Sequence, residues 1–238
     1  MVITTTEFDK QMKNIFKPDL IVEVTSVCNR ACNGCYAPNV VSKDSAQELM
    51  KKDSNLFLDV DKLQALIDGW DTFSPDVISV RGGEPSLHPE LLAIVRMLST
   101  LGQNVVVETH ARWLLGNERN QYISFIEGLR NTKGIIKISF DSMHGLKSID
   151  LKEITEFLDD YGISYIIGIT EKTYEEFFIK RLACNWIEDS KIYFQKKAEN
   201  INELIKPMIG VINVQGELRK NLTTKFDIRD LIKEAVTC

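Results

Sequence analysis

The chain has 238 residues, of which 44% are hydrophobic, and its 29 Lys and Arg against 34 Asp and Glu give a formal net charge of −5. This length can bury a substantial core, and the acidic balance argues against non-specific binding to nucleic acid or to an anionic membrane. No apolar stretch approaches the roughly 20 residues that span a bilayer, and residues 1–17 lack the apolar segment of a secretory signal. We therefore expect a cytoplasmic protein whose five cysteines are thiols or metal ligands rather than disulfides.

Short β-rich runs alternate with helical patterns along the chain. The patterns predict strands at 20–27, 77–81, 104–109, 135–140, 163–169 and 191–195, and helices at 59–73, 89–101, 119–131, 150–161 and 173–188. Six repeated βα units predict a parallel sheet with right-handed crossovers but are too few to close an eight-stranded barrel. The expected fold class is α/β, a partial and open (β/α)6 TIM-like barrel.

No linker-like or low-complexity tract interrupts this pattern. We expect a single domain that consists of an N-terminal extension (1–19), the barrel core (20–197) and a C-terminal extension (198–238). Residues at helix ends support the helices: Asp150 and Thr173 can cap helix starts, and Gly102 and Gly162 follow helix ends.

Three cysteines, Cys28, Cys32 and Cys35, stand in a C-x3-C-x2-C spacing directly after the first predicted strand. Three thiolates this close can surround one metal centre, and sulfur ligands suit zinc or an iron–sulfur cluster. A structural zinc site needs four protein ligands, whereas a four-iron cluster held by three cysteines leaves one iron open. The zinc alternative would take its fourth ligand from a distant histidine: His88, His110 or His144.

A second motif, Gly82-Gly83-Glu84-Pro85, follows the second predicted strand. Together the two motifs resemble the radical S-adenosylmethionine (radical SAM) superfamily, over about residues 19 to 197. The resemblance implies a 4Fe-4S cluster on the three cysteines and S-adenosylmethionine on its open iron. It also implies reductive cleavage of that cofactor to a 5′-deoxyadenosyl radical, which abstracts a substrate hydrogen, with electrons from a donor such as flavodoxin or ferredoxin.

The resemblance also assigns residues to the cofactor. Gly82 and Gly83 would let the backbone approach the methionyl group, Glu84 would face its ammonium, and Pro85 would stiffen the turn. The ribose would be held by Ser139 or Asp141. An adenine-supporting pattern, G-x-I-x-G-x-x-E, matches at three of its four positions, with Ser164 replacing the first glycine: Ile166, Gly168 and Glu171.

Gly34 stands where many members of the superfamily carry an aromatic residue, so aromatic packing on the adenine would come from Tyr36 or from elsewhere. Simpler interpretations stay open for several of these residues. Glu84 could cap the helix that follows, and Ser139 and Asp141 could be ordinary polar groups at strand ends. His110 is a candidate for a substrate or proton role, or a structural histidine.

The C-terminal residues indicate a class of substrate. Residues 214–220, followed by 227–236, look like the glycine-containing hairpin and short helix that end peptide-modifying radical SAM enzymes, without their additional cluster cysteines. Cys184 reads as a buried small hydrophobic residue and Cys238 as a terminal thiol, so we expect a single cluster.

The expected substrate is a peptide side chain, with a nucleoside-like metabolite as the second choice. A glycyl-radical enzyme activase is an alternative enzyme function. A metal-stabilised or electron-carrying scaffold is the alternative outside catalysis.

Overall fold

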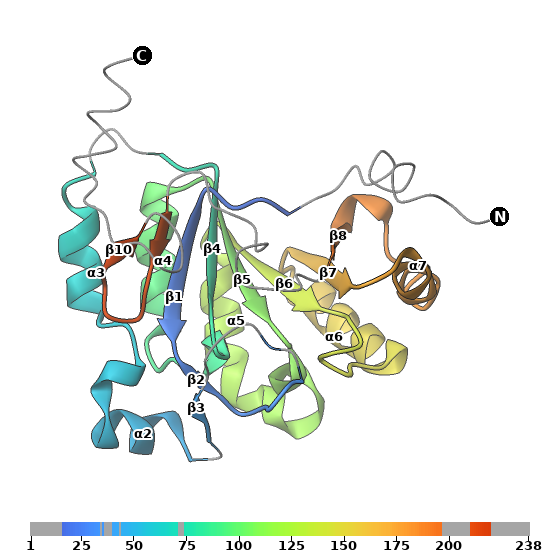
Figure 1. Ribbon diagram of the computed structural model, residues 1–238, viewed down its shortest axis with the longest axis horizontal. Coiled ribbons are helices and arrows are strands. Elements are labelled where there is room, and N and C mark those ends of the chain that lie inside the picture. Colours follow the sequence, from blue (N-terminus) through green and yellow to red (C-terminus); the bar gives the residue numbers. More distant parts are fainter. Residues whose placement is uncertain are drawn as a thin grey trace.

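The computed structural model describes residues 16–33, 35, 40–42, 44–70, 74–196 and 210–219. Its main sheet contains β1 (Leu20–Thr25), β4 (Val77–Gly82), β5 (Asn104–Thr109), β6 (Gly134–Ser139), β7 (Tyr165–Glu171), β8 (Ile192–Lys196), β9 (Gly210–Ile212) and β10 (Leu218–Arg219). The strand order is β10-β9-β1-β4-β5-β6-β7-β8 (Figure 1). The six strands from β1 to β8 are parallel neighbours in chain order. Because the two ends of this sheet do not pair with each other, the predicted open partial barrel is confirmed.

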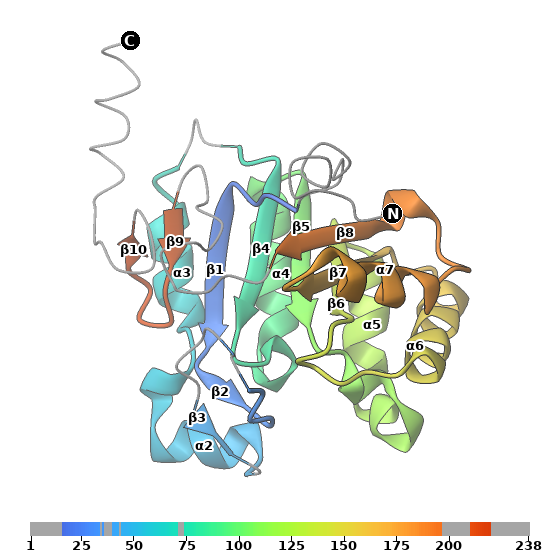
Figure 2. The ribbon, with the colours of Figure 1, turned by 45° about the vertical axis from the view of Figure 1, so that its right-hand side comes forward.

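In the described part of the chain, an α-helix precedes each of the strands β4 to β8: α3 (Val60–Ile67), α4 (Leu91–Leu101), α5 (Ile123–Arg130), α6 (Ser148–Asp160) and α7 (Tyr174–Leu182). Figures 1 and 2 show α3 to α6 on one face of the sheet. Alternate residues of the strands point to opposite faces, and those facing the helices are fully buried aliphatic side chains, such as Ile78, Val107 and Ile138. The other set of alternate residues is free to line a cavity.

Helix boundaries differ from the predicted ones at several points. The helix predicted at 59–73 ends at Ile67, and the one predicted at 173–188 ends at Leu182. Thr173 caps α7 as predicted, since it accepts a hydrogen bond from the Glu176 N–H. The prediction that Asp150 starts a helix is wrong: α6 begins at Ser148, and Asp150 in its first turn accepts the Lys147 N–H at 3.0 Å.

Some elements were not predicted from the sequence. The short strands β2 (Val27–Cys28) and β3 (Val40–Val41) pair with each other, and α2 (Ala46–Lys52) follows them. These three elements lie at the end of the sheet where β1 and β4 finish (Figure 2). Two-residue strands are too short for a periodic pattern.

The C-terminal hairpin is present as predicted. Strand β9 runs parallel to β1, and β10 returns antiparallel to β9 through a turn in which Gly216 has φ +75°. That left-handed conformation favours glycine. The helix predicted near 227–236 lies outside the described residues, as do Tyr36 and Cys238.

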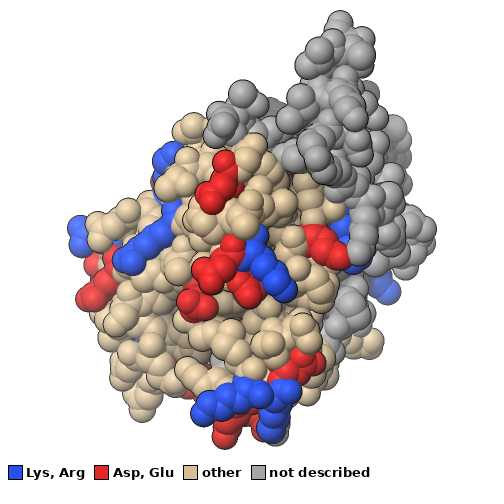
Figure 3. All heavy atoms as spheres, turned by 90° about the vertical axis from the view of Figure 1, so that its left-hand side faces the viewer, with Lys and Arg blue, Asp and Glu red and all other residues tan. Residues whose placement is uncertain are grey.

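The face of the molecule seen in Figure 3 carries acidic and basic side chains interspersed with each other. Among the described helices, none has the length and apolar composition required to cross a membrane.

Candidate functional site

One cavity brings together residues from both sequence motifs and from the ends of the central strands. Its wall includes the three motif cysteines, the Gly82 to Glu84 turn after β4, and His110 after β5. Further along the sheet it includes Ser139, Asp141 and Gly168 from β6, the turn after it and β7. In parallel α/β sheets and barrels, functional residues gather at the carboxyl ends of the strands. The cavity therefore has the position expected of an active site.

The three cysteines differ in exposure. Cys28 ends β2 and is 6% exposed, Cys32 is half-buried and Cys35 is exposed. Burial raises the pKa of the Cys28 thiol to about 11, against a hydrogen bond from the Arg30 backbone, and Glu84, Cys32 and Cys35 add to the rise. Because neighbouring thiolates and Glu84 disfavour one another's charge, a cation between the sulfurs would stabilise the ionised set.

Three thiol donors on one cavity wall suit an iron–sulfur cluster. As the side chains stand, the described residues contain no group of three or more Cys, His, Asp or Glu placed to hold a metal ion. Cluster binding by these cysteines stays a prediction.

The Gly-Gly-Glu-Pro turn is hydrogen-bonded directly to the cysteine-bearing strand. The Gly83 N–H donates to the Thr25 carbonyl at 2.7 Å, and the Glu84 N–H donates to the Val27 carbonyl at 2.8 Å. A Cβ at Gly83 would lie 2.0 Å from the Val27 oxygen, and one at Gly82 would lie 2.3 Å from the Thr25 oxygen. Both glycines are therefore required for the close approach of the two motifs, whatever they also offer to a ligand.

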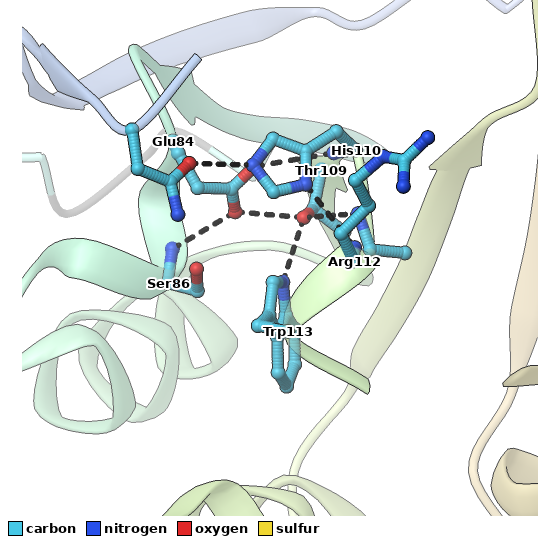
Figure 4. Close-up of polar contacts among 8 residues, drawn as sticks. Glu84, Ser86, Thr109, His110, Arg112 and Trp113 are labelled. Atoms are coloured by element: carbon cyan, nitrogen blue, oxygen red, sulfur yellow. Dashed lines mark hydrogen bonds and ion pairs between the residues drawn. The ribbon is translucent and has the colours of Figure 1, made fainter. Parts of the chain in front are cut away.

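The Glu84 carboxylate is 1% exposed and lies at the centre of a polar network (Figure 4). Its Oε1 accepts hydrogen bonds from the Ser86 N–H at 3.2 Å and from the Thr109 hydroxyl at 2.7 Å. Its Oε2 accepts the His110 N–H at 3.2 Å. Glu84 thus caps the short 3-10 turn η2 (Pro85–Leu87), one of the two roles considered from the sequence. Its role toward an ammonium group stays a prediction.

Thr109, at the end of β5, shares this network. Its hydroxyl accepts the Ala111 N–H at 2.9 Å and the Trp113 indole N–H at 2.8 Å while donating to Glu84. Among the described non-glycine residues Ala111 alone has a positive φ, 57°. Such a conformation costs about 1 to 2 kcal/mol outside glycine, and conformations of this kind cluster at functional sites.

His110 is a buried, hydrogen-bonded histidine. Its Nδ1 accepts the Arg112 N–H at 3.1 Å, so the proton of the neutral ring is on Nε2, which lies 2.9 Å from Asn29 Oδ1 and 3.2 Å from Glu84 Oε2. Burial lowers the pKa of His110, against the effect of Glu84. His110 therefore links the segment between Cys28 and Cys35 to Glu84, which favours the structural interpretation.

The histidines of the zinc alternative are partly committed elsewhere. His88 uses both ring nitrogens within the protein, Nε2 with the Leu58 carbonyl at 2.9 Å and Nδ1 with the Glu90 N–H at 3.1 Å. His110 likewise uses both. His144 has its Nδ1 2.7 Å from Asp141 Oδ1 and, like His110, lines the cavity that the cysteines line.

The turn after β6 is held by two buried carboxylates. Asp141 is 1% exposed and accepts the His144 N–H at 2.9 Å in addition to the ring contact. Glu171, 4% exposed, accepts the Ser142 N–H at 2.7 Å and the Ser142 hydroxyl at 2.8 Å. Asp141 lines the cavity, whereas Glu171 is outside the cavity lining and stabilises the turn through its bonds to Ser142. Their roles toward ribose and adenine stay predictions.

Of the other residues predicted to bind the cofactor, some line the cavity and some do not. Ser139 and Gly168 line the cavity, and a Cβ at Gly168 would lie 2.7 Å from Lys137 Cε, so glycine leaves room for that lysine. Ile166 is a half-buried β7 residue opposite Lys137. Pro85 is buried at the start of η2.

Two ion pairs on the cavity face of the sheet were not predicted from the sequence. Glu23 pairs in register with Arg81, with the side chains 3.9 Å apart, and Glu108 pairs with Lys137 at 2.7 Å. Burial would raise the pKa of Glu108, but Lys137, Arg81 and a hydrogen bond from Ser79 hold it below its usual range. A polar residue in each otherwise apolar strand was the available signal.

The fold of this chain is similar to that of a solved radical SAM structure. A solved structure described as native anSMEcpe with bound AdoMet, an anaerobic sulfatase-maturating radical SAM enzyme, matches 75% of this chain and 51% of its own chain, with 15% identity and a TM-score of 0.50. The chain therefore has the partial-barrel fold of that radical SAM structure.

A second structure, described as a histidine-tagged form of anSMEcpe with bound AdoMet, matches 75% of this chain and 49% of its own, with 16% identity and a TM-score of 0.49. The chain matches about half the length of anSMEcpe in both structures. No protein-family model and no curated protein matches the sequence.

Proposed function

We propose that the chain is a radical SAM enzyme that binds one 4Fe-4S cluster through Cys28, Cys32 and Cys35. One observation carries the proposal: the Gly-Gly-Glu-Pro turn is hydrogen-bonded to Thr25 and Val27, directly before Cys28, and both motifs line one cavity of a radical SAM-type partial barrel. The sequence motifs and the fold thus support the same proposal.

The cluster and S-adenosylmethionine, when bound, would supply reductive cleavage of a carbon–sulfur bond and hydrogen abstraction from the substrate. The residues of this chain would position those groups. The Gly82 to Glu84 turn fixes the start of the cysteine segment through its bonds to Thr25 and Val27. His110 holds Asn29 at 2.9 Å, next to the first cysteine. Asp141 orients His144 on the opposite part of the wall.

We assign a peptide side chain as the substrate, supported by the hairpin of β9 and β10 that extends the sheet beside β1. A small iron–sulfur or flavin protein such as ferredoxin or flavodoxin would donate the electron, and a reducing cytoplasm would preserve the cluster. The exposure of Cys35, which lines the cavity, supports approach of such a donor to the cysteines.

The first test is anaerobic reconstitution with iron and sulfide. We expect about four iron atoms and four sulfides per chain in the unaltered protein and in Cys184→Ala, which changes a fully buried cysteine beside α7. Cys28→Ala, Cys32→Ala and Cys35→Ala should each lose the cluster. One zinc per chain without sulfide would instead establish the zinc alternative.

A second measurement separates enzyme from scaffold. S-adenosylmethionine added to the reduced protein should change the electron paramagnetic resonance spectrum of the cluster, because the open iron gains ligands. An intact cluster whose spectrum ignores S-adenosylmethionine would favour an electron-carrying scaffold.

A further inference from the structure

Arg30 stands between Cys28 and Cys32 and lines the cavity. It is half-buried, and its Nε is removed from solvent without a hydrogen-bond partner. Within the described part of the chain, no carboxylate forms an ion pair with its guanidinium. Other arginines do have such partners: Arg119 with Glu153, Arg181 with Asp189, and Arg219 with Glu217.

The carboxylates on the cavity wall are committed to other donors. Glu84 accepts hydrogen bonds from Ser86, Thr109 and His110. Asp141 is bonded to His144, and Glu108 to Lys137. None of these three forms an ion pair with Arg30, so its guanidinium is available to a ligand in the cavity.

A guanidinium remains charged at every physiological pH and offers a planar set of N–H donors. Those donors match a carboxylate, which can accept two parallel hydrogen bonds from one arginine. Leaving such a group partly buried and unpaired is costly unless a ligand pairs with it.

We propose that Arg30 binds a carboxylate of the substrate, so that the cavity selects acidic peptides. This inference rests on the proposed function, which supplies the peptide. The carboxylate belongs either to an Asp or Glu side chain or to the C-terminus of the peptide.

The test uses the reconstituted protein with S-adenosylmethionine and a randomised octapeptide pool, prepared once as C-terminal acids and once as C-terminal amides. Retained peptides are sequenced by mass spectrometry. We expect retained peptides to be enriched about tenfold or more, the value of one charge-assisted hydrogen bond, either in Asp and Glu over Asn and Gln or in C-terminal acids over C-terminal amides. Enrichment of Asp and Glu that persists in the amide pool assigns a side chain. Retention of the acid pool over the amide pool assigns the C-terminus.

Arg30→Gln should abolish this enrichment, Arg30→Lys should retain part of it, and Arg119→Gln, which changes an exposed arginine, should retain all of it. Iron content and affinity for S-adenosylmethionine should be unchanged in Arg30→Gln. Undiminished acidic enrichment in Arg30→Gln would overturn the inference. So would weakened S-adenosylmethionine binding with unchanged peptide selection, since Arg30 would then serve the cofactor.

The experiments can refute the proposed function and the role of Arg30 independently of each other. A protein that selects acidic peptides through Arg30 but binds no S-adenosylmethionine would refute the enzyme and leave the role of Arg30 standing. A protein that binds S-adenosylmethionine but shows no acidic preference would refute the role of Arg30 alone.

Discussion

The Thr109 hydroxyl bonds three buried groups: the Glu84 carboxylate, which has further donors, and the Ala111 N–H and Trp113 indole N–H, for which no other partner is present among the described residues. Thr109→Val keeps the side-chain volume and removes all three bonds. We expect the free energy of unfolding to fall by about 2 to 4 kcal/mol, because each unsatisfied buried group costs about 1 to 3 kcal/mol and part of the loss is relieved by relaxation. Urea denaturation measures it. Thr109→Ser keeps the hydroxyl, and an equal loss there would show that the methyl group matters instead.

Gly83 tests the contact between the two motifs. A Cβ at this position would lie 2.0 Å from the Val27 oxygen, whereas a Cβ at Gly69 meets nothing within 4 Å. Gly83→Ala should therefore displace β2, lower the free energy of unfolding by more than about 2 kcal/mol and reduce the iron bound on reconstitution. Gly69→Ala should do neither. Equal iron content in both variants would show that the close approach is dispensable.

Single residues were predictable where a short motif carries them. The three cysteines were found from their spacing, and Gly82 to Glu84 from the resemblance of the two motifs to the radical SAM superfamily; the structure brings them to one cavity. Their connecting contacts were not predictable, because Thr109 and His110 lie 25 and 26 residues from Glu84 and meet it through strand pairing. Arg30 was overlooked because a cation in a cysteine segment has no pattern that distinguishes it from a solvated side chain.

At the scale of elements, His88 connects η2 to the segment before α3 through the Leu58 carbonyl. Burial lowers its pKa from 6.5, against the effect of that carbonyl. The unfolded chain therefore binds a proton below pH 6.5 that the folded chain resists, so stability is full above this pH and is lost as the pH falls. His110, whose pKa is also lowered, acts in the same direction.

We expect the free energy of unfolding to decrease from about pH 7 to about pH 5.5, and more steeply in the unaltered protein than in His88→Gln. Denaturant titrations at a series of pH values measure both slopes. Identical slopes would mean that His88 is protonated as readily in the folded protein as in the unfolded chain.

The six parallel strands were predictable because buried apolar runs alternate with helical periodicity, and all six are present within a few residues of the expected bounds. Helix ends were less predictable. The start of α6 at Ser148 precedes the expected cap, since an acidic residue is equally suited to the first turn of a helix. Strands β2 and β3 exist only through their pairing with each other, a contact between segments without periodicity.

At the scale of the whole molecule, the open sheet places an apolar helix-covered face opposite a cavity face that carries charges. The fold class followed from the count of βα units, whereas the ion pairs and hydrogen bonds on the cavity face of the sheet followed only from the structure. The fold alone does not define an activity, so the proposal depends on the cysteines and the turn that holds them.

The most direct test is to reduce the reconstituted protein anaerobically with S-adenosylmethionine and to quantify 5′-deoxyadenosine and methionine by mass spectrometry, with and without the acidic octapeptide pool. We predict both products from the unaltered protein and from Cys184→Ala, and neither from Cys32→Ala. An intact 4Fe-4S cluster that yields no 5′-deoxyadenosine in either condition, or equal yields from Cys32→Ala, would contradict the assignment as a radical SAM enzyme.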